Sequence, residues 1–126
     1  MNGNPPKVSI VVNSFKDLDK LKLCVDAIKK TRYDNKEVIV VSYGIPERAI
    51  KTSNISSSIN KLILLKKDLG PPAQRNIGFK TRDDDSKYVL FVDDDVLLTE
   101  LAIENLIRVL EMFPLYKCRP ASISDS

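Results

Sequence analysis

Four short apolar runs, each bounded by polar or turn-forming residues, predict the strands of a sheet. They are VSIVV, EVIVVSYG, KLILLK and KYVLFV, at residues 8–12, 37–44, 61–66 and 87–92. None of them alternates between apolar and polar positions, as a strand with one face in water would. We therefore expect strands that are buried on both faces, which is typical of a parallel sheet covered by helices.

The segments between these runs predict helices. Apolar residues recur at helical spacing from Asp17, a suitable N-terminal cap, to about Tyr33. A short helix is expected from Pro46, and a last one from Thr99 to about Phe113. Between them, residues 70–81 are expected to form a loop that leads into a further helix. Strands that alternate with helices predict an α/β fold with three layers around a mainly parallel sheet.

The length and composition favour one domain. The chain has 126 residues, of which 43% are hydrophobic and 29% charged. We expect an ordered core over about residues 7–113 and a polar tail over residues 114–126 that frays. No apolar run is long enough to span a membrane, and the first residues lack the pattern of a secretory signal, so we expect a cytoplasmic protein.

Charge and cysteine content narrow the kinds of partner. The formal net charge of +3 is spread over lysine pairs and forms no basic block, so no nucleic acid partner is expected. The two cysteines, Cys24 and Cys118, have neither metal-ligand spacing nor a disulfide framework. We expect a buried thiol and a thiol in the tail.

Two runs of three aspartates flank the fourth apolar run. The amino-end triplet, residues 83–85, precedes the strand and is expected to be a solvated loop. The carboxyl-end triplet, Asp93, Asp94 and Asp95, follows the strand, at the edge where α/β sheets bind ligands. Two carboxylates about 5 Å apart repel by roughly 3 kcal/mol at an effective dielectric near 20, so this triplet predicts a bound cation.

Strand geometry places Asp93 and Asp95 on one side of the strand and Asp94 on the other. Such a pair of carboxylates suits Mg²⁺ or Mn²⁺, with phosphate oxygens and water at the remaining positions. The alternative is that Asp95 caps the next helix while the others face solvent, although Thr99 already offers a cap. Arg75, in the segment GPPAQRNIGFKT, either meets the phosphates with nearby backbone N–H groups or pairs with a surface acid.

Four segments carry a family resemblance. VSIVVNSF, EVIVVSYG, GPPAQRNIGF and YVLFVDDDV, at residues 8–15, 37–44, 70–79 and 88–96, occur in the order and approximate spacing of the family 2 glycosyltransferases. From residue 7 to about 113 the chain resembles the nucleotide-sugar-binding portion of their GT-A fold. The resemblance implies a Rossmann-like sheet with the core order 3-2-1-4, in which strands 1 and 4 end side by side.

The resemblance also implies a function and its residues. A sugar would pass from a nucleoside diphosphate, usually UDP, to the hydroxyl of a glycan, lipid or protein acceptor, with Mn²⁺ or Mg²⁺ as cofactor. The residues expected to bind the nucleotide sugar are Asn13, Ser14, Ser42, Arg75, Asp93 and Asp94, and those expected to bind the metal ion are Asp93 and Asp95.

Two departures from the family leave alternatives open. Ser42 and Tyr43 stand where the family usually has an acid that reads the uracil ring, and Tyr43 either stacks on a base or packs at the sheet edge. No general base is identified, because Glu100, Glu104 and Glu111 are most simply the solvated face of the last helix. A separate acceptor domain is not evident, so the chain is a fragment, a minimal enzyme, or a module completed by a homo-oligomer or a partner chain.

Other classes fit less well. A phosphatase of the haloacid dehalogenase type would use Asp93 as nucleophile and Asp95 as acid and base, but its motif normally opens the domain, and three predicted strands precede Asp93 here. A Toprim-type nuclease would need a glutamate after the first strand, where this chain has Asn13. A non-catalytic nucleotide-sugar-binding module remains as the main alternative to an enzyme.

Overall fold

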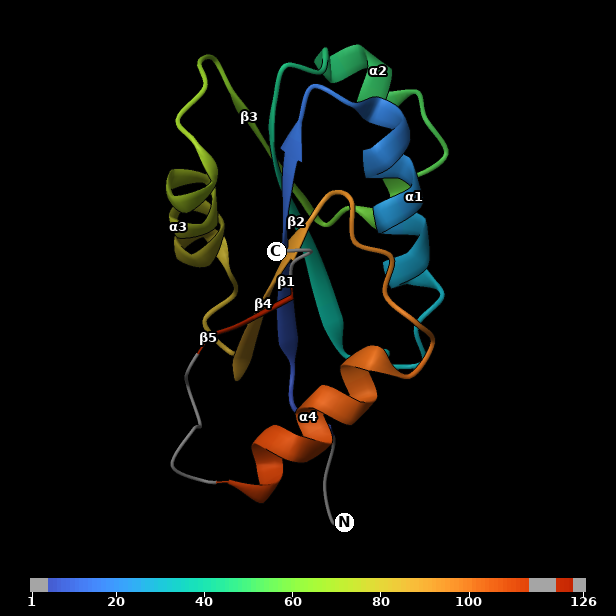
Figure 1. Ribbon diagram of the computed structural model, residues 1–126, viewed down its shortest axis with the longest axis vertical. Coiled ribbons are helices and arrows are strands. Elements are labelled where there is room, and N and C mark those ends of the chain that lie inside the picture. The colour runs from blue at the N-terminus through green and yellow to red at the C-terminus, as the bar shows by residue number, and fades with distance from the viewer. Residues whose placement is uncertain (1–4, 114–119, 124–126) are drawn as a thin grey trace.

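A five-stranded parallel sheet forms the centre of the protein (Figure 1). In this computed structural model we describe residues 5–113 and 120–123. The strands are β1 (Val8–Phe15), β2 (Lys36–Tyr43), β3 (Lys61–Leu65), β4 (Tyr88–Asp93) and β5 (Pro120–Ile123). Their order is β3-β2-β1-β4-β5, and every neighbouring pair is parallel. The α/β class and the core order 3-2-1-4 are thereby confirmed.

Helices cover both faces of the sheet. They are α1 (Leu18–Lys29), α2 (Glu47–Lys51), α3 (Pro71–Thr81) and α4 (Ala102–Met112), with a 3₁₀ turn at Ser56–Ser58. Helix α3 lies against one face, and α1, α2 and α4 lie on the other (Figure 1), which gives the expected three layers. Within the described ranges, no helix is long and apolar enough to cross a membrane.

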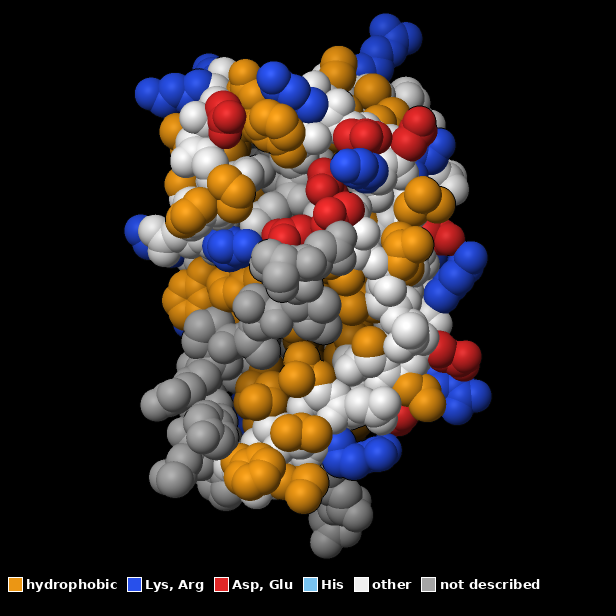
Figure 2. Space-filling view, in the orientation of Figure 1, with side chains coloured by type: hydrophobic (Ala, Val, Ile, Leu, Met, Phe, Trp, Pro, Cys, Tyr) orange, Lys and Arg blue, Asp and Glu red, His pale blue; other side chains and the backbone are white. Residues whose placement is uncertain are grey.

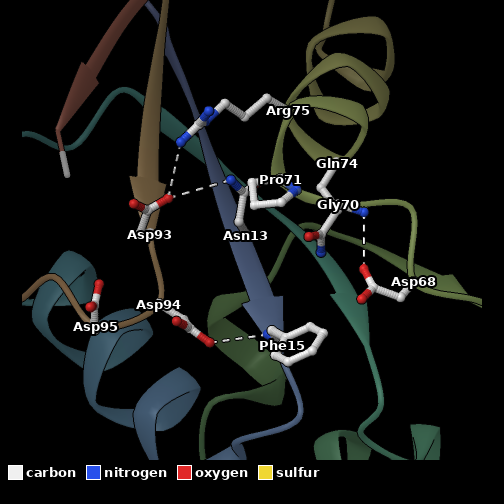
Figure 3. A pocket seen from close by; sticks show the side chains of 10 residues that line it. All are labelled: Asn13, Phe15, Asp68, Gly70, Pro71, Gln74, Arg75, Asp93, Asp94 and Asp95. Atoms are coloured by element: carbon white, nitrogen blue, oxygen red, sulfur yellow. Dashed lines mark hydrogen bonds and ion pairs between the residues drawn. The ribbon is translucent and has the colours of Figure 1, made fainter. Parts of the chain in front are cut away.

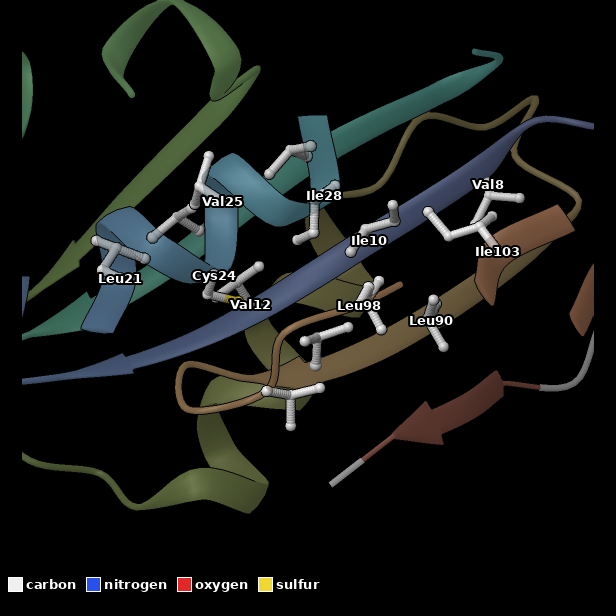
Figure 4. Close-up of a cluster of buried hydrophobic side chains, with 14 of the residues drawn as sticks. Val8, Ile10, Val12, Leu21, Cys24, Val25, Ile28, Leu90, Leu98 and Ile103 are labelled. Atoms are coloured by element: carbon white, nitrogen blue, oxygen red, sulfur yellow. The ribbon is translucent and has the colours of Figure 1, made fainter. Parts of the chain in front are cut away.

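The apolar runs supply the core of both layers. Successive side chains of a strand point to opposite faces, so Ile10 and Val12 of β1 pack towards α1, while Val11 packs in a second cluster with Ile77 of α3. Figure 4 shows the larger cluster between β1, β4 and α1. Each fully buried valine, leucine or isoleucine stabilises the fold by about 1.5–3 kcal/mol, so a polar residue at an interior position of these strands would be costly.

Helix α3 lies very close to β1. A Cβ atom on Gly78 would stand 2.2 Å from Cγ1 of Val11, so a larger residue would push the helix away from the sheet. The close approach also buries Gln74, which is 3% exposed. Its Nε2 donates to the backbone oxygens of Ser14 (3.1 Å) and Val41 (3.0 Å). This side chain therefore ties the start of α3 to the ends of β1 and β2.

Two helix starts differ from the prediction. Residues 71–81 form α3 itself and not a loop that leads into a helix. Proline is tolerated in the first turn because its missing N–H has no partner there anyway, and Gly70 supplies the left-handed φ of 84° just before it. Helix α4 begins at Ala102, so the residue at its N-cap position is Leu101, whose side chain makes no hydrogen bond to the helix. Thr99 is therefore not the cap of this helix.

The predicted frayed tail contains a strand. Residues 120–123 form β5 beside β4, with Val89 opposite Pro120 and Val92 opposite Ile123. A sequence of only four residues that starts with proline is a weak strand signal, yet an edge strand tolerates proline because one side of its backbone has no neighbour. Cys118 lies outside the described residues.

The amino-end triplet is only partly the solvated loop that was expected. Asp83 accepts hydrogen bonds from Nζ of Lys61 (2.6 Å) and of Lys7 (2.5 Å), and these bonds lower the pKa of Asp83 to about 2. Its backbone N–H donates to Oε2 of buried Glu37 at 2.7 Å. Asp84 is exposed, and Asp85 is exposed with one contact, at 3.3 Å, to Lys7. The prediction is therefore wrong for Asp83, which belongs to an ion-pair network.

Candidate functional site

Strands β1 and β4 end side by side at the carboxyl edge of the sheet, with Asn13 opposite Asp93. A cavity of about 430 Å³ opens there (Figure 3). Three parts of the chain line it: Asn13 and Phe15 from β1; Asp68, Gly70, Pro71, Gln74 and Arg75 from the β3–α3 loop and α3; and Asp93, Asp94 and Asp95 from the end of β4 and the turn after it. In the space-filling view, acidic side chains gather near where β4 ends, with basic side chains beside them (Figure 2).

Among the described residues, the side chain of Asp93 makes long contacts alone. Its Oδ1 lies 3.4 Å from Nδ2 of Asn13 and 3.5 Å from Nη2 of Arg75. Its side chain is 32% exposed and that of Arg75 is 35% exposed. Ordinary charge-assisted bonds are about 2.7–2.9 Å long, so both contacts are weak enough to be exchanged for bonds to a ligand.

Asp94 accepts the backbone N–H of Phe15 at 3.1 Å and so joins the turn after β4 to the end of β1. Partial burial raises the pKa of this carboxyl group; the bond from Phe15 opposes that rise, and the nearby charge of Asp95 adds to it. A raised pKa means that the surroundings of Asp94 disfavour its charged form, which a nearby cation would favour.

Asp95 is exposed and has no hydrogen bond or ion pair with the residues that the structure describes. The alternation that was expected to pair it with Asp93 ends too early, because β4 stops at Asp93 and the backbone N–H of Val96 closes a turn on Asp93 O at 3.0 Å. Asp94 contacts β1 as Asp93 does, while Figure 3 shows Asp95 on the far side of the turn. All three nevertheless line one cavity.

The described residues do not form a closed metal site at this edge. No group of three or more His, Cys, Asp or Glu side chains is placed to enclose a metal ion within residues 5–113 and 120–123. The carboxylates of Asp93 and Asp95 offer oxygen ligands, which Mg²⁺ and Mn²⁺ prefer, but the remaining ligands would have to come from a bound molecule and water.

Ser14 and Ser42 do not contribute their hydroxyl groups to the cavity. They lie opposite each other on β1 and β2, Ser42 Oγ donates to Ser14 Oγ at 3.0 Å, and both residues are at most 1% exposed. The strands run on to Phe15 and Tyr43, so the serines stand inside the sheet and not at its ends. In this geometry the hydroxyl groups of Ser14 and Ser42 are therefore not available to a nucleotide, and binding through the backbone groups of these residues stays a prediction.

Phe15, Asp68 and Gln74 line the cavity but were not among the predicted site residues. The order Asp-x-Gly at residues 68–70 is a recognisable turn signal, and Oδ1 of Asp68 does accept the N–H of Gly70 at 3.0 Å. Nothing in the sequence indicates that this turn lies across the cavity from the carboxyl-end triplet.

Comparisons with known proteins agree with this architecture. The model of the family described as "Glycosyl transferase family 2" matches residues 9–116. Glycosyltransferase GlyA of Streptococcus pneumoniae serotype 4 is 27% identical over 104 residues, which are 81% of this chain and 15% of GlyA. Crystal structures of S. aureus TarS share the fold at 20% identity over 84% of this chain. They include the fragment 1–349 in complex with UDP-GlcNAc (TM-score 0.72) and with UDP (TM-score 0.69).

The chain spans 15% of the length of GlyA and between 20% and 32% of the TarS chains. The part that matches contains strands β2, β3 and β4 and nearly all of β1, the residues that line the cavity, and both aspartate triplets. With the family model matching most of its length and the fold agreeing with GT-A structures, the chain belongs to glycosyl transferase family 2.

Proposed function

We propose that this chain is the donor-binding part of a glycosyltransferase that moves a sugar from a nucleoside diphosphate, UDP in the first instance, to an acceptor hydroxyl. The observation that carries the proposal is the cavity of about 430 Å³ at the carboxyl edge, which is lined by the carboxyl-end triplet and by Arg75. The family membership supports the same conclusion and makes the phosphatase alternative wrong.

Within this proposal the carboxylates have different tasks. Asp93 and Asp95 would hold Mg²⁺ or Mn²⁺, and the cation would neutralise the diphosphate as it leaves the sugar. Arg75 would give up its long contact with Asp93 and donate to phosphate oxygens. Asn13, with Oδ1 buried and without a hydrogen bond to any described group, is placed to bind a polar group of the nucleotide. Asp94 would keep the turn in place through Phe15.

The choice of UDP has indirect support. The TarS fragment was crystallised with UDP-GlcNAc and with UDP, and this chain shares its fold. Among the described residues we identify no binding site for the acceptor, whether it is a glycan, a lipid or a protein. We propose that the acceptor binds to a further part of the protein, to a second copy or to a partner chain.

A non-catalytic nucleotide-sugar-binding module is the second candidate, and one observation favours it. The carboxylates of Glu100 and Glu111, in the C-terminal part, already accept hydrogen bonds from basic side chains. Arg32 donates to Glu100 at 2.7 Å, and Lys87 donates to Glu111 at 3.1 Å. The carboxylates that line the cavity are Asp68 and the carboxyl-end triplet, so no further acid stands there, among the residues described, to serve as general base.

Calorimetric titration with UDP tests the proposal. We expect binding with Mn²⁺ or Mg²⁺ and much weaker binding in excess EDTA, because the cation joins two carboxylates to the diphosphate. Equal affinity with and without the cation would contradict the proposed metal role. Incubation with UDP-sugars, followed by assay of released UDP, then separates the two candidates: turnover supports an enzyme, and tight cation-dependent binding without turnover supports the binding module.

A further inference from the structure

Gln74 and Arg75 are neighbours near the start of α3, and both line the cavity (Figure 3). Arg75 is the residue proposed to donate to the phosphates, yet its own contacts hold it weakly. Its Nη2 lies 3.5 Å from Oδ1 of Asp93, and its Nε is buried without a hydrogen bond to any described group. The position of the guanidinium group is therefore set mainly by the helix that carries it.

The first turn of α3 lacks the usual side-chain cap. Gly70 stands at the N-cap position, and it has no side chain that could accept a hydrogen bond from the free N–H groups of the turn. The next two residues, Pro71 and Pro72, have no N–H to donate. Other contacts must therefore fix this turn against the sheet.

The side chain of Gln74 supplies such contacts. Its amide group carries two N–H donors, and Nε2 lies 3.1 Å from the backbone oxygen of Ser14 and 3.0 Å from that of Val41. These oxygens belong to two neighbouring strands, since Ser14 is in β1 and Val41 is in β2. Because Gln74 is only 3% exposed and is bonded to both strands, it fixes the start of α3 relative to the carboxyl edge of the sheet.

We propose that Gln74 is a positioning residue, which holds Arg75 towards the diphosphate of a nucleotide bound at the carboxyl-end triplet. Gln74 does not need to touch the ligand in this role. Its two bonds fix the backbone of the first turn of α3, and so they fix the point from which the side chain of Arg75 extends. The inference rests on the proposed function, because it assumes that the phosphates bind between the triplet and Arg75.

A double-variant cycle tests this by calorimetric titration with UDP in the presence of Mn²⁺. Gln74→Met keeps a side chain of similar length and removes both N–H donors. We expect it to weaken UDP binding about 10-fold or more, the size of one hydrogen bond from a charged group, which is lost when Arg75 is displaced. Arg75→Met should weaken binding at least as much. In the double variant, Gln74→Met should add no further loss, since a residue that acts through Arg75 has no effect without it.

Unfolding measurements separate this role from a purely structural one. Gln74→Met takes a donor away from two buried backbone oxygens, so its urea midpoint should fall by the same amount with and without Arg75. Thr81→Val is the matched control, because Thr81 Oγ1 donates to the backbone oxygen of Ile77 at 2.7 Å at the other end of the same helix. This variant should leave the UDP affinity unchanged.

NMR on the wild type provides a test that does not depend on the folding of a variant. On addition of UDP and Mg²⁺, the Nε–H signal of Arg75 should shift, because this group gains a phosphate nearby. The side-chain NH₂ signals of Gln74 should keep their positions, because its two bonds persist. Gln74 signals that shift as far as the Arg75 signal would show that these bonds break on binding, which overturns the inference.

Three further results overturn the positioning role and leave the donor site intact. Wild-type UDP affinity in Gln74→Met assigns the two bonds to stability alone. An equal loss of affinity with and without Arg75 shows that Gln74 does not act through it. An unchanged affinity in Arg75→Met removes the group that was to be positioned. A wild type that binds no UDP in the presence of Mn²⁺ overturns both the inference and the proposed function.

Discussion

The two aspartate triplets flank the same strand and meet opposite conditions. At the amino end of β4, Asp83 has Lys61 and Lys7 within 2.6 Å. At the carboxyl end, the ion pair of Asp93 with Arg75 is 3.5 Å long, and Asp95 has no cation in contact among the described residues. One triplet is neutralised by the fold itself, and the other keeps charge that a ligand can neutralise. An acidic run at the carboxyl end of a parallel strand is thus placed to meet a ligand, whereas the run at the amino end forms ion pairs within the fold.

The largest expected difference between the triplets is in cation-dependent binding. Asp95→Ala removes a proposed metal ligand, so we expect a loss of UDP affinity in Mn²⁺ at least as large as the roughly 10- to 100-fold that loss of an outer-shell partner costs. Asp85→Ala, which removes an exposed carboxylate from the other triplet, leaves affinity unchanged. Calorimetry on both variants checks this, and equal losses would erase the distinction between the two edges.

The amino edge is expected to matter for stability instead. Lys61→Met takes the ammonium group away from Asp83 and from Oε1 of Glu37, which lies 3.1 Å away on a residue that is 3% exposed. Leaving that buried carboxylate without a cation costs about 1–3 kcal/mol of unfolding free energy, measurable by urea denaturation. The matched variant Lys66→Met, at an exposed position just after the other end of β3, shows little change. A loss of UDP affinity without a loss of stability in Lys61→Met would contradict this division.

The pH dependence of Asp83 follows from its lowered pKa of about 2 in the folded state, against an ordinary value of 3.8. A lowered pKa contributes stability that is present above about pH 4 and lost as the pH falls towards about 2. Asp83→Asn should therefore lower stability at neutral pH and flatten the acid part of the curve. Urea midpoints between pH 2 and 7 test this; an unchanged acid slope would show that the lysines do not stabilise the charged form.

Asp94 should behave in the opposite sense, with a smaller effect. Burial raises its pKa in the folded state, so the stability linked to its protonated form is present below the unfolded value near 3.8 and is lost as the pH rises through the folded value. Asp94→Asn removes that charge and can keep the bond from Phe15, so we expect a slightly higher unfolding midpoint at pH 7. A lower midpoint would mean that the charge itself stabilises the turn.

Much of this arrangement could be predicted from the sequence. The apolar runs of the four core strands and the cap at Asp17 follow from local patterns, the order of the sheet follows from the family resemblance, and the structure agrees with all three. The position of the carboxyl-end triplet next to Asn13 follows from that order. The strands and the cap depend on contacts that repeat along one element, which is why the sequence pattern alone predicts them.

The remaining features depend on contacts between distant segments. Polar residues near a strand end look alike in the sequence, yet Ser14 and Ser42 are paired inside the sheet while Asn13 reaches the cavity. The lysines that neutralise Asp83 come from residues 7 and 61, far away along the chain. Helix α3 packs closely on β1 because Gly78 has no side chain, which the pattern alone does not reveal.

Paramagnetic broadening by Mn²⁺ tests the central claim most directly. With UDP present, substoichiometric Mn²⁺ should reduce the amide NMR signals of Asn13, Asp93 and Asp95 and spare those of Asp83 and Asp85, which lie beyond the other end of β4. That strand has six residues, so the two triplets are roughly 20 Å apart, at about 3.3 Å per residue, and the effect falls steeply with distance. Broadening that centres on the amino-end triplet, or that affects both triplets equally, would contradict the account.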